Sequence, residues 1–269
     1  MRDEDLSRIR EGLRAALAAL RALPERAIGV RSKGAAGPVT DADHAIDTVL
    51  RTTLPRAGEG WLSEETADDL GRLTCSRCWV VDPLDGTREF VEGIPEWAIS
   101  VGLVEDGRAV AGGILNPATG EAFVGAVDSG LTFNERPATV RIESRLAAAC
   151  VLASRSEVGR GEWSGVGAAF DLVPMGSVAY KMARVAAGLA DATWTLVPKS
   201  EWDVAAGTAL VLAGGGRVRT PAGEVPLFNK KEPLFPGLVA TSAAVSGEVD
   251  EFLRGRSAAA ERSGDVRAS

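Results

Sequence analysis

Apolar residues in the first part of the chain recur at the three- and four-residue spacing of amphipathic helices. This spacing predicts a helix over residues 4–23, which Pro24 ends because proline lacks an amide hydrogen and clashes with the preceding turn. A second helix is expected to begin at Thr40, with aliphatic residues between 46 and 54 on one face. The Gly/Ser-rich stretch 29–40 before it is a loop that serves either as a mobile lid or as a connection.

Short apolar runs replace the helical spacing from residue 58 onward and predict strands. The run 58–65 is expected to be a strand that ends in acidic residues. Residues 97–104 and 108–115 are separated by an Asp-Gly pair and predict an antiparallel hairpin. Residues 121–127 and 131–140 are expected to add strands to the same antiparallel sheet.

The second half of the chain alternates between helix-like and strand-like segments. Helices are predicted at 163–170, 177–189, 203–213 and 245–254, and strands at 148–153, 171–174, 192–197, 217–219, 225–228 and 237–241. The whole pattern indicates an α+β fold built in layers. We predict an N-terminal α+β subdomain at 1–143, a C-terminal α/β subdomain at 144–254 and a disordered tail at 255–269.

Composition and charge narrow the class of protein. The 269 residues are 45% hydrophobic and 25% charged, as in ordinary globular proteins. The net charge of −7 and the lack of a basic stripe disfavour a nucleic acid polymer as partner. No apolar run reaches the roughly 18–20 residues of a membrane helix, and the charged N-terminus does not resemble a signal peptide, so a cytoplasmic protein is expected.

Histidine and cysteine content limits the chemistry. His44 is the single histidine, which excludes histidine-rich metal sites and most histidine-based triads. Cys75 and Cys78 form one C-x-x-C pair without a second pair, so ordinary reduced thiols are expected rather than a zinc knuckle. Carboxylates must therefore carry any metal chemistry, which favours Mg²⁺ or Mn²⁺ over Zn²⁺.

The most informative stretch is WVVDPLDGTREF at 79–90, where a buried strand runs into a turn and then a short helix. Asp82 and Asp85 lie three positions apart, and with the carbonyl of Leu84 they present the oxygen ligands that hard divalent cations prefer. The N–H groups of Gly86 and Thr87 open the helix and predict an anion pocket. An ordinary turn with helix-capping acids is the alternative interpretation.

Three other acids are candidates to join this turn. Glu64 ends the strand at 58–65, and alone it is typical of a solvated surface acid. Asp43 follows Thr40 by three positions, which suits a capping box, a carboxylate near the metals, or both. Asp203 is expected at a helix start, as an N-cap or as a further metal ligand, because the small residues 205–207 allow that helix to approach another element closely.

Together these blocks resemble the inositol monophosphatase superfamily of Mg²⁺-dependent, lithium-sensitive phosphatases. The matching blocks are Lys33 with Pro38-Val39-Thr40-Asp41-Ala42-Asp43, Ser63-Glu64-Glu65, Asp82-Pro83-Leu84-Asp85-Gly86-Thr87 and Trp202-Asp203-Val204-Ala205-Ala206-Gly207. The resemblance spans about residues 5–245 and implies a layered αβαβα sandwich, the sugar-phosphatase-like fold.

The resemblance also implies roles for individual residues. Glu64, Asp82 and the Leu84 carbonyl would bind the first Mg²⁺, and Asp82, Asp85 and Asp203 the second, with a third ion touching Glu64. Asp43 and Thr87, together with Glu64, would act in catalysis by orienting or deprotonating the attacking water. Metal-bound water is a nucleophile without histidine, so direct transfer to water with no phospho-enzyme is expected. The candidate substrate contacts are Gly86, Thr87, Ser177, Lys181 and Asp203.

Within the superfamily the sequence leans toward the nucleotide branch. The run 82–90 is similar to that of bacterial 3'(2'),5'-bisphosphate nucleotidases, as are Ser154-Arg155-Ser156 and the block at 229–233. Lys181 either meets a second phosphate or packs its stem on its helix as a solvated lysine. Glu201 departs from the family pattern and adds negative charge beside the site.

The favoured substrate is adenosine 3',5'-bisphosphate or its sulfated form. The alternatives are inositol 1-phosphate or another small sugar phosphate, and a metal- and phosphate-binding regulator without turnover. The first helix and the hairpin region are candidate surfaces for a homodimer.

Overall fold

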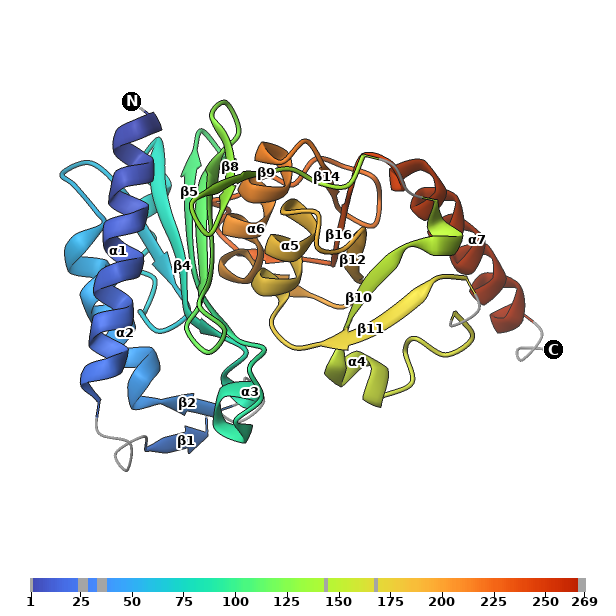
Figure 1. The fold of residues 1–269 in the computed structure, drawn as a ribbon, viewed down its shortest axis with the longest axis horizontal. Coiled ribbons are helices and arrows are strands. Elements are labelled where there is room, and N and C mark those ends of the chain that lie inside the picture. The colour runs from blue at the N-terminus through green and yellow to red at the C-terminus, as the bar shows by residue number, and fades with distance from the viewer. Residues whose placement is uncertain (1, 24–28, 33–37, 143–144, 167–168, 266–269) are drawn as a thin grey trace.

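The computed structural model describes residues 2–23, 29–32, 38–142, 145–166 and 169–265. Figure 1 shows a layered molecule in which helices and sheets alternate from one side to the other. The layers are two helices, a large sheet, two central helices, a smaller sheet and an outer helix, which confirms the predicted αβαβα sandwich. No helix in the described ranges is long and apolar enough to cross a membrane.

The larger sheet has seven strands in the order β3-β4-β5-β6-β7-β8-β9 and is antiparallel except for the β3–β4 pair. Its hairpin β5–β6 is the one predicted, and its turn places Asp106 and Gly107 at positive φ. The strand predicted at 131–140 is instead a hairpin, because Asn134 and Glu135 adopt positive φ and reverse the chain. The strands are β3 (Gly60–Ser63), β4 (Arg77–Asp85), β5 (Ala98–Glu105), β6 (Arg108–Asn116), β7 (Glu121–Ala126), β8 (Gly130–Phe133) and β9 (Arg136–Ala138).

Helices α1 (Arg2–Ala22) and α2 (Asp41–Thr53) cover the outer face of this sheet, as Figure 1 shows. Both were predicted, and Thr40 is the N-cap of α2. Ile9, Ile46 and Trp79 are fully buried in the cluster between these helices and the sheet. The strands β1 (Val30–Ser32) and β2 (Pro38–Thr40) pair between the two helices, and Lys33 lies outside the described residues.

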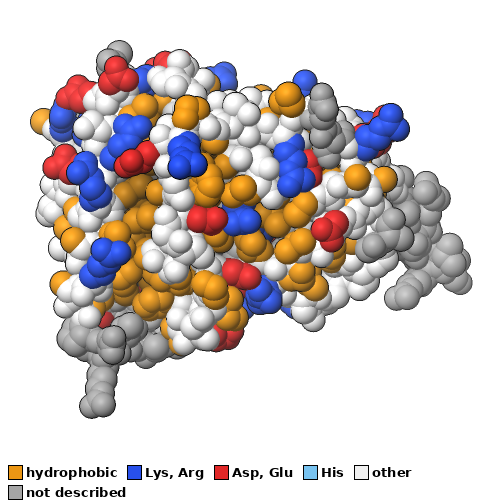
Figure 2. Space-filling model, in the orientation of Figure 1, with side chains coloured by type: hydrophobic (Ala, Val, Ile, Leu, Met, Phe, Trp, Pro, Cys, Tyr) orange, Lys and Arg blue, Asp and Glu red, His pale blue; other side chains and the backbone are white. Residues whose placement is uncertain are grey.

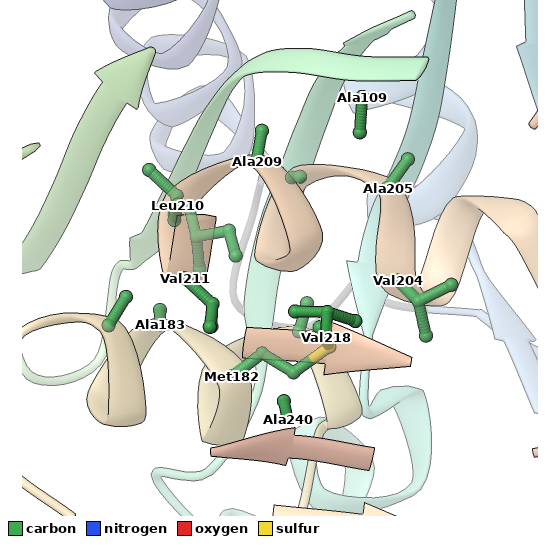
Figure 3. Close-up of a cluster of buried hydrophobic side chains, with 14 of the residues drawn as sticks. Ala109, Met182, Ala183, Val204, Ala205, Ala209, Leu210, Val211, Val218 and Ala240 are labelled. Atoms are coloured by element: carbon green, nitrogen blue, oxygen red, sulfur yellow. The ribbon is translucent and has the colours of Figure 1, made fainter. Parts of the chain in front are cut away.

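Helices α5 (Val178–Ala186) and α6 (Glu201–Ala213) form the central layer. Figure 3 shows Ala205 and Ala209 of α6 pointing toward the strand of Ala109, and Val211 pointing the other way, toward Met182. Gly102 and Gly112 face each other across β5 and β6, directly beneath α6. A Cβ on Gly112 would lie 2.6 Å from the carbonyl oxygen of Ala206, so glycine is required for this close packing.

The smaller sheet has five strands in the order β11-β10-β12-β16-β14, with parallel β10–β11 and β10–β12 pairs. Its outer face packs against α7 (Ser246–Asp265) through an aromatic cluster that includes Trp194 and Phe252. A separate two-stranded pair joins β13 (Lys199–Ser200), directly before α6, to β15 (Leu234–Phe235), which follows β14 in the chain. The remaining elements are β10 (Cys150–Ser154), α4 (Arg155–Gly159), β11 (Asp171–Met175), β12 (Ala192–Thr195), β14 (Arg217–Arg219), β16 (Leu238–Thr241), α3 (Thr87–Glu92), and the 3-10 turns η2 (Gly71–Thr74) and η3 (Leu146–Ala148).

Three predicted elements of the second half were wrong. The described residues of 163–170 are not helical. Trp163 and Phe170 instead pack on Trp194, with ring centroids 4.9 and 5.4 Å away, and this packing explains why they are apolar. Residues 225–228 form no strand. Within the described residues, this segment makes one backbone hydrogen bond to a neighbouring segment, from Phe228 N to Gly107 O at 2.8 Å. The predicted disordered tail is helical through Asp265, as its alanine-rich sequence favours.

Two further predictions concern the cysteine thiols and the charged surface. Cys75, Cys78 and Cys150 are unpaired thiols, as expected. Figure 2 shows acidic and basic side chains interspersed on one face of the molecule, without a basic stripe on that face. The division proposed at residues 143 and 144 falls outside the described residues and stays a prediction, and α6 from the second half packs on the first sheet.

Candidate active site

The central motif lies at the end of β4, the strand next to the edge strand β3. The strand does not stop at Asp82, as the motif suggested, but continues to Asp85 with a register shift between the two acids. This irregularity accommodates Pro83, which has no amide hydrogen to give to a strand ladder. Gly86 follows with φ +94° and begins α3, and a Cβ there would lie 3.1 Å from the carbonyl oxygen of Glu96. The turn therefore needs glycine for both its backbone angle and its close packing.

A cavity of about 390 Å³ opens over this turn. Its walls come from β4, α3, β10, α4, α5, β13 and α6 and from Glu64, which follows β3, so residues from both halves of the chain meet there. The lining residues are Glu64, Asp82, Leu84, Asp85, Gly86, Thr87, Arg88, Glu89, Ser154, Ser156, Gly176, Ser177, Val178, Lys181, Lys199, Ser200, Trp202 and Asp203. Of the predicted site residues, all except Asp43 line this cavity.

Asp82 is the most deeply placed of the acids. Its side chain is 2% exposed, and its Oδ1 accepts a hydrogen bond of 2.9 Å from the backbone N–H of Leu84. Burial, and then the neighbouring carboxylates of Glu64, Asp85 and Asp203, raise its pKa well above the ordinary aspartate value. The four acids are therefore close enough in space to destabilise one another's charges, although they are far apart in the sequence.

Asp85 is held at the start of α5. Its Oδ2 accepts hydrogen bonds of 2.6 Å from both Ser177 Oγ and the backbone N–H of Ala179. Ser177 is the N-cap of α5 and adopts φ +50°, which is unusual for a residue other than glycine. The predicted N-cap is confirmed, and the same hydroxyl that was predicted to contact substrate orients Asp85 in this structure.

Asp203 lies in the first turn of α6, and its role as a metal ligand stays a prediction. It is not the N-cap of α6, which is Ser200, but the third helical residue, and its Oδ2 accepts a hydrogen bond of 3.1 Å from Ser200 N. Burial, and secondarily the charge of Asp85, raise the pKa of Asp203 to about 7. Asp203 thus closes a capping box and also lines the cavity of the central motif.

Asp43 also serves its own helix while facing the site. Its Oδ2 accepts hydrogen bonds from Thr40 N at 2.7 Å and Thr40 Oγ1 at 2.5 Å, as in a capping box. Its Oδ1 lies 3.3 Å from Thr87 Oγ1, which is also 3.0 Å from the carbonyl oxygen of Leu84. Asp43, Thr87 and the Leu84 carbonyl therefore form one short chain of polar contacts at the edge of the cavity.

Lys181 is neither a solvated lysine nor a side chain that extends freely into the cavity. It is 3% exposed, and its Nζ donates to the carbonyl oxygens of Met175, Gly176 and Ser177 at 3.3, 3.4 and 3.0 Å. Burial lowers its pKa to about 8. Its ammonium therefore fastens the turn before α5 and adds positive charge beneath the carboxylates.

The donor set suits a hard divalent cation. Four carboxylates and one backbone carbonyl supply oxygen ligands only, which is the chemistry that Mg²⁺ selects. A divalent cation would also offset the repulsion that raises the pKa of Asp82. Within the described residues, no three His, Cys, Asp or Glu side chains stand ready-made as a metal-binding group.

Sequence reasoning missed several residues of the cavity. Arg88 and Lys199 bring positive charge to its wall, and the signal was their position next to the two acidic motifs. Two basic residues that suggested a nucleotide substrate, Arg155 and Lys230, do not line the cavity. Arg155 Nη2 binds both carboxylate oxygens of Glu96, at 2.7 and 2.6 Å, and Lys230 Nζ lies 3.7 Å from the centroid of the Phe235 ring. These contacts depend on the folded loops and have no local sequence signal.

The chain is similar to known proteins over most of its length. The family model described as the inositol monophosphatase family matches residues 5–254. An inositol-1-monophosphatase of Rhizobium meliloti is 34% identical over 197 residues, which span 70% of this chain and 73% of the relative.

Solved structures share the fold over nearly the whole chain. The extragenic suppressor protein suhB of Bartonella henselae matches with a TM-score of 0.79 and 29% identity, covering 93% of this chain and 98% of that one. CysQ of Bacteroides thetaiotaomicron, described as a bacterial member of the inositol monophosphatase family, matches with a TM-score of 0.75 over 89% of this chain and 97% of its own. At 23% identity the likeness to CysQ shows the fold alone.

Proposed function

The chain belongs to the inositol monophosphatase family of phosphoric monoester hydrolases, and from that premise we propose that it hydrolyses a small phosphorylated polyol or sugar of the inositol 1-phosphate class, with Mg²⁺ as cofactor. The observation that carries the proposal is the meeting of Glu64, Asp82, Asp85 and Asp203 in one cavity. These acids come from three separate segments of the chain: the end of β3, strand β4 and the start of α6. A purely structural role for any one of them would not bring the other three to the same cavity.

The roles proposed for the residues are those implied by the family resemblance, and the cavity brings most of these residues together. Glu64, Asp82, Asp85, Asp203 and the Leu84 carbonyl would hold two Mg²⁺ ions, or three with the last at Glu64. Bound Mg²⁺ lowers the pKa of water and stabilises the charge that develops on phosphate oxygens. Thr87 Oγ1 would orient the attacking water, with Asp43 as the group that accepts a proton through it. Gly86 and Thr87 would present backbone N–H groups to the phosphate at the start of α3.

The substrate class rests on the relative and on the cavity. The Rhizobium meliloti relative is named for inositol 1-monophosphate, and it is similar over more than two thirds of both chains. A cavity of about 390 Å³ lined by acids, serines and backbone amides suits a polyhydroxylated ligand. The structure also lends less support to the nucleotide branch than the sequence did, because Arg155 and Lys230 bind other protein groups.

A 3'(2'),5'-bisphosphate nucleotidase is the second candidate. Arg88 and Lys199 line the same cavity as the acids and would meet a second phosphate group. The similarity of residues 82–90 to the nucleotidase motif supports the same candidate. Lithium inhibition, a cytoplasmic location and a homodimer accompany both candidates as predictions.

The test is phosphate release with Mg²⁺ from inositol 1-phosphate and from adenosine 3',5'-bisphosphate, side by side and with or without lithium. A clear preference for inositol 1-phosphate supports the first candidate, and a preference for the bisphosphate supports the second. Asp85→Asn is expected to lower kcat more than about 100-fold, since outer-shell changes alone cost 10 to 100-fold. Asp171→Asn, at an exposed position on β11, is the matched control. No turnover of either substrate by the wild-type protein would favour a phosphate-binding regulator.

A further inference from the structure

Glu201 is a buried acid that the proposed mechanism does not use. It is the first residue of α6, two positions before Asp203, and its side chain is 0% exposed. Its two carboxylate oxygens accept hydrogen bonds from the backbone N–H groups of Asn229, at 2.7 Å, and Lys230, at 3.1 Å. Burial raises the pKa of Glu201, and these two bonds oppose the rise. Glu201 therefore ties the segment at 229–230 to the start of the helix that carries Asp203.

Arg72 also binds the segment at 229–230, through hydrogen bonds to Asn229 and Lys230. Its side chain is 2% exposed, and it donates to Asn229 Oδ1 at 2.7 Å and to the carbonyl oxygen of Lys230 at 2.8 Å. Asn229 Nδ2 donates back to the carbonyl oxygen of Arg72 at 3.1 Å. Asn229 itself adopts φ +58°, so an uncommon backbone conformation is maintained between the two buried charges.

Asp68 extends this set of contacts toward the segment that follows Glu64. It lies between Glu64 and η2, and its Oδ2 accepts hydrogen bonds from Arg72 Nε at 3.1 Å and Arg72 Nη2 at 2.8 Å. We call Asp68, Arg72, Asn229, Lys230 and Glu201 the Asp68–Glu201 bridge. It runs without a gap from the segment that follows Glu64 to the helix turn that presents Asp203.

We propose that the Asp68–Glu201 bridge is a positioning device that sets the separation of Glu64 and Asp203 for divalent cation binding. This inference rests on the proposed function, because it takes both acids as metal ligands. Glu64 follows the end of β3 in the first sheet and Asp203 lies on the central helix α6, so no single element holds both. The hydrogen bonds of the bridge have a fixed geometry, so they constrain the distance between the two acids in addition to the packing of α6 on the first sheet.

The form of the bridge supports a role beyond stability. Buried charges lose their hydration, and hydrophobic residues of similar volume are often equally stabilising. A fully buried glutamate and a buried arginine that bind the same two residues, Asn229 and Lys230, are a costly way to close a loop. Groups that orient metal ligands commonly contribute 10 to 100-fold in metal affinity.

The test is Mg²⁺ binding by isothermal titration calorimetry, without substrate, together with thermal unfolding of the chelated protein. In Glu201→Gln the amide NH₂ would face a backbone N–H donor, so one of the two bonds is lost at nearly constant volume. We expect Mg²⁺ affinity to fall roughly tenfold. Asn229→Gly keeps a residue suited to positive φ and removes only the contacts with Arg72, so it is the second variant, with a smaller loss of affinity.

Asp191→Asn is the matched control. Asp191 is also 0% exposed and accepts a backbone N–H, from Cys150 at 2.8 Å, but it lies outside the lining of the cavity. It is expected to lower the thermal midpoint without changing Mg²⁺ affinity. If the bridge variants lower the midpoint like Asp191→Asn and keep wild-type Mg²⁺ affinity, the bridge is structural and the inference is overturned.

The two proposals fail in different ways. A wild-type protein that binds no Mg²⁺ overturns both. A wild-type protein that binds Mg²⁺ but releases no phosphate overturns the proposed function, and weaker Mg²⁺ binding by the bridge variants would still support the positioning role.

Discussion

Replacing Gly112 by alanine is expected to weaken both the fold and the site, because one methyl group would collide with the backbone of α6. The added Cβ would lie 2.6 Å from the carbonyl oxygen and 2.9 Å from the Cα of Ala206. Neither atom belongs to a flexible side chain, so α6 must move by about 0.4 Å or more to bring the first contact to 3.0 Å, below which real Cβ atoms are essentially not found.

The size of the effect follows from this geometry. Overpacking of a well-packed core costs about 1–3 kcal/mol, and each kcal/mol lowers the thermal midpoint of a chain of this size by roughly 2–4 °C. Asp203 is three residues before Ala206 on the same helix, so the displacement also reaches the site. Since a 1 Å misplacement can cost about 100-fold in rate, a loss of roughly tenfold in kcat is expected for Gly112→Ala.

The assay compares thermal unfolding and phosphate release for Gly112→Ala and Gly247→Ala. Gly247 lies in α7, where a Cβ would meet nothing within 4 Å, so that variant is expected to match the wild type or to be slightly more stable. If Gly112→Ala retains the wild-type midpoint and kcat, α6 does not pack on β6 as closely as described. A lower midpoint with unchanged kcat would refute the coupling between helix position and the site.

Two further predictions concern buried carboxylates. Asp82→Asn keeps the acceptor for Leu84 N and removes a charge that Glu64, Asp85 and Asp203 destabilise, so the chelated variant is expected to be at least as stable as the wild type. Mg²⁺ at 100 times its Kd should stabilise the wild type by about 2.7 kcal/mol and the variant by far less, and an equal rise of the thermal midpoint in both would remove Asp82 from the metal site. Burial alone would raise the pKa of Glu59, but hydrogen bonds from Arg8 and other donors lower this pKa from 4.5 to about 2. The Glu59 carboxylate therefore stabilises the fold above pH 4.5, and this contribution is lost as the pH falls toward 2. Glu59→Gln should therefore cost roughly 1.5–3 kcal/mol in urea unfolding at pH 7 and much less near pH 2.5, and a cost independent of pH would contradict the assignment.

Local sequence patterns predicted the helices and strands that carry the site. They failed where a residue is apolar because it packs against a distant part of the chain. The capping box of Thr40 and Asp43, the N-cap Ser177 and the hairpin turn at Asp106 and Gly107 all depend on residues close in the sequence. Residues 163–170 were predicted to be helical, but Trp163 and Phe170 pack on Trp194 from a segment that is not a helix. The spacing of apolar residues indicates which residues are buried but not which residues they pack against.

The chemistry of the site could be predicted from local sequence: one histidine, an Asp-Pro-Leu-Asp-Gly-Thr turn at a strand end, and further acids at element boundaries together point to oxygen ligands and a divalent cation. Helix and strand periods are local properties and predicted a layered α+β fold, whereas the αβαβα order of the layers was implied by the resemblance to the superfamily. Only the tertiary structure decided that Ser177 orients Asp85, that Lys181 binds three carbonyls, and that Glu201 joins a bridge to Arg72. Such contacts join residues from separate loops and helices, and their geometry is set by how the layers pack rather than by the preference of any one segment.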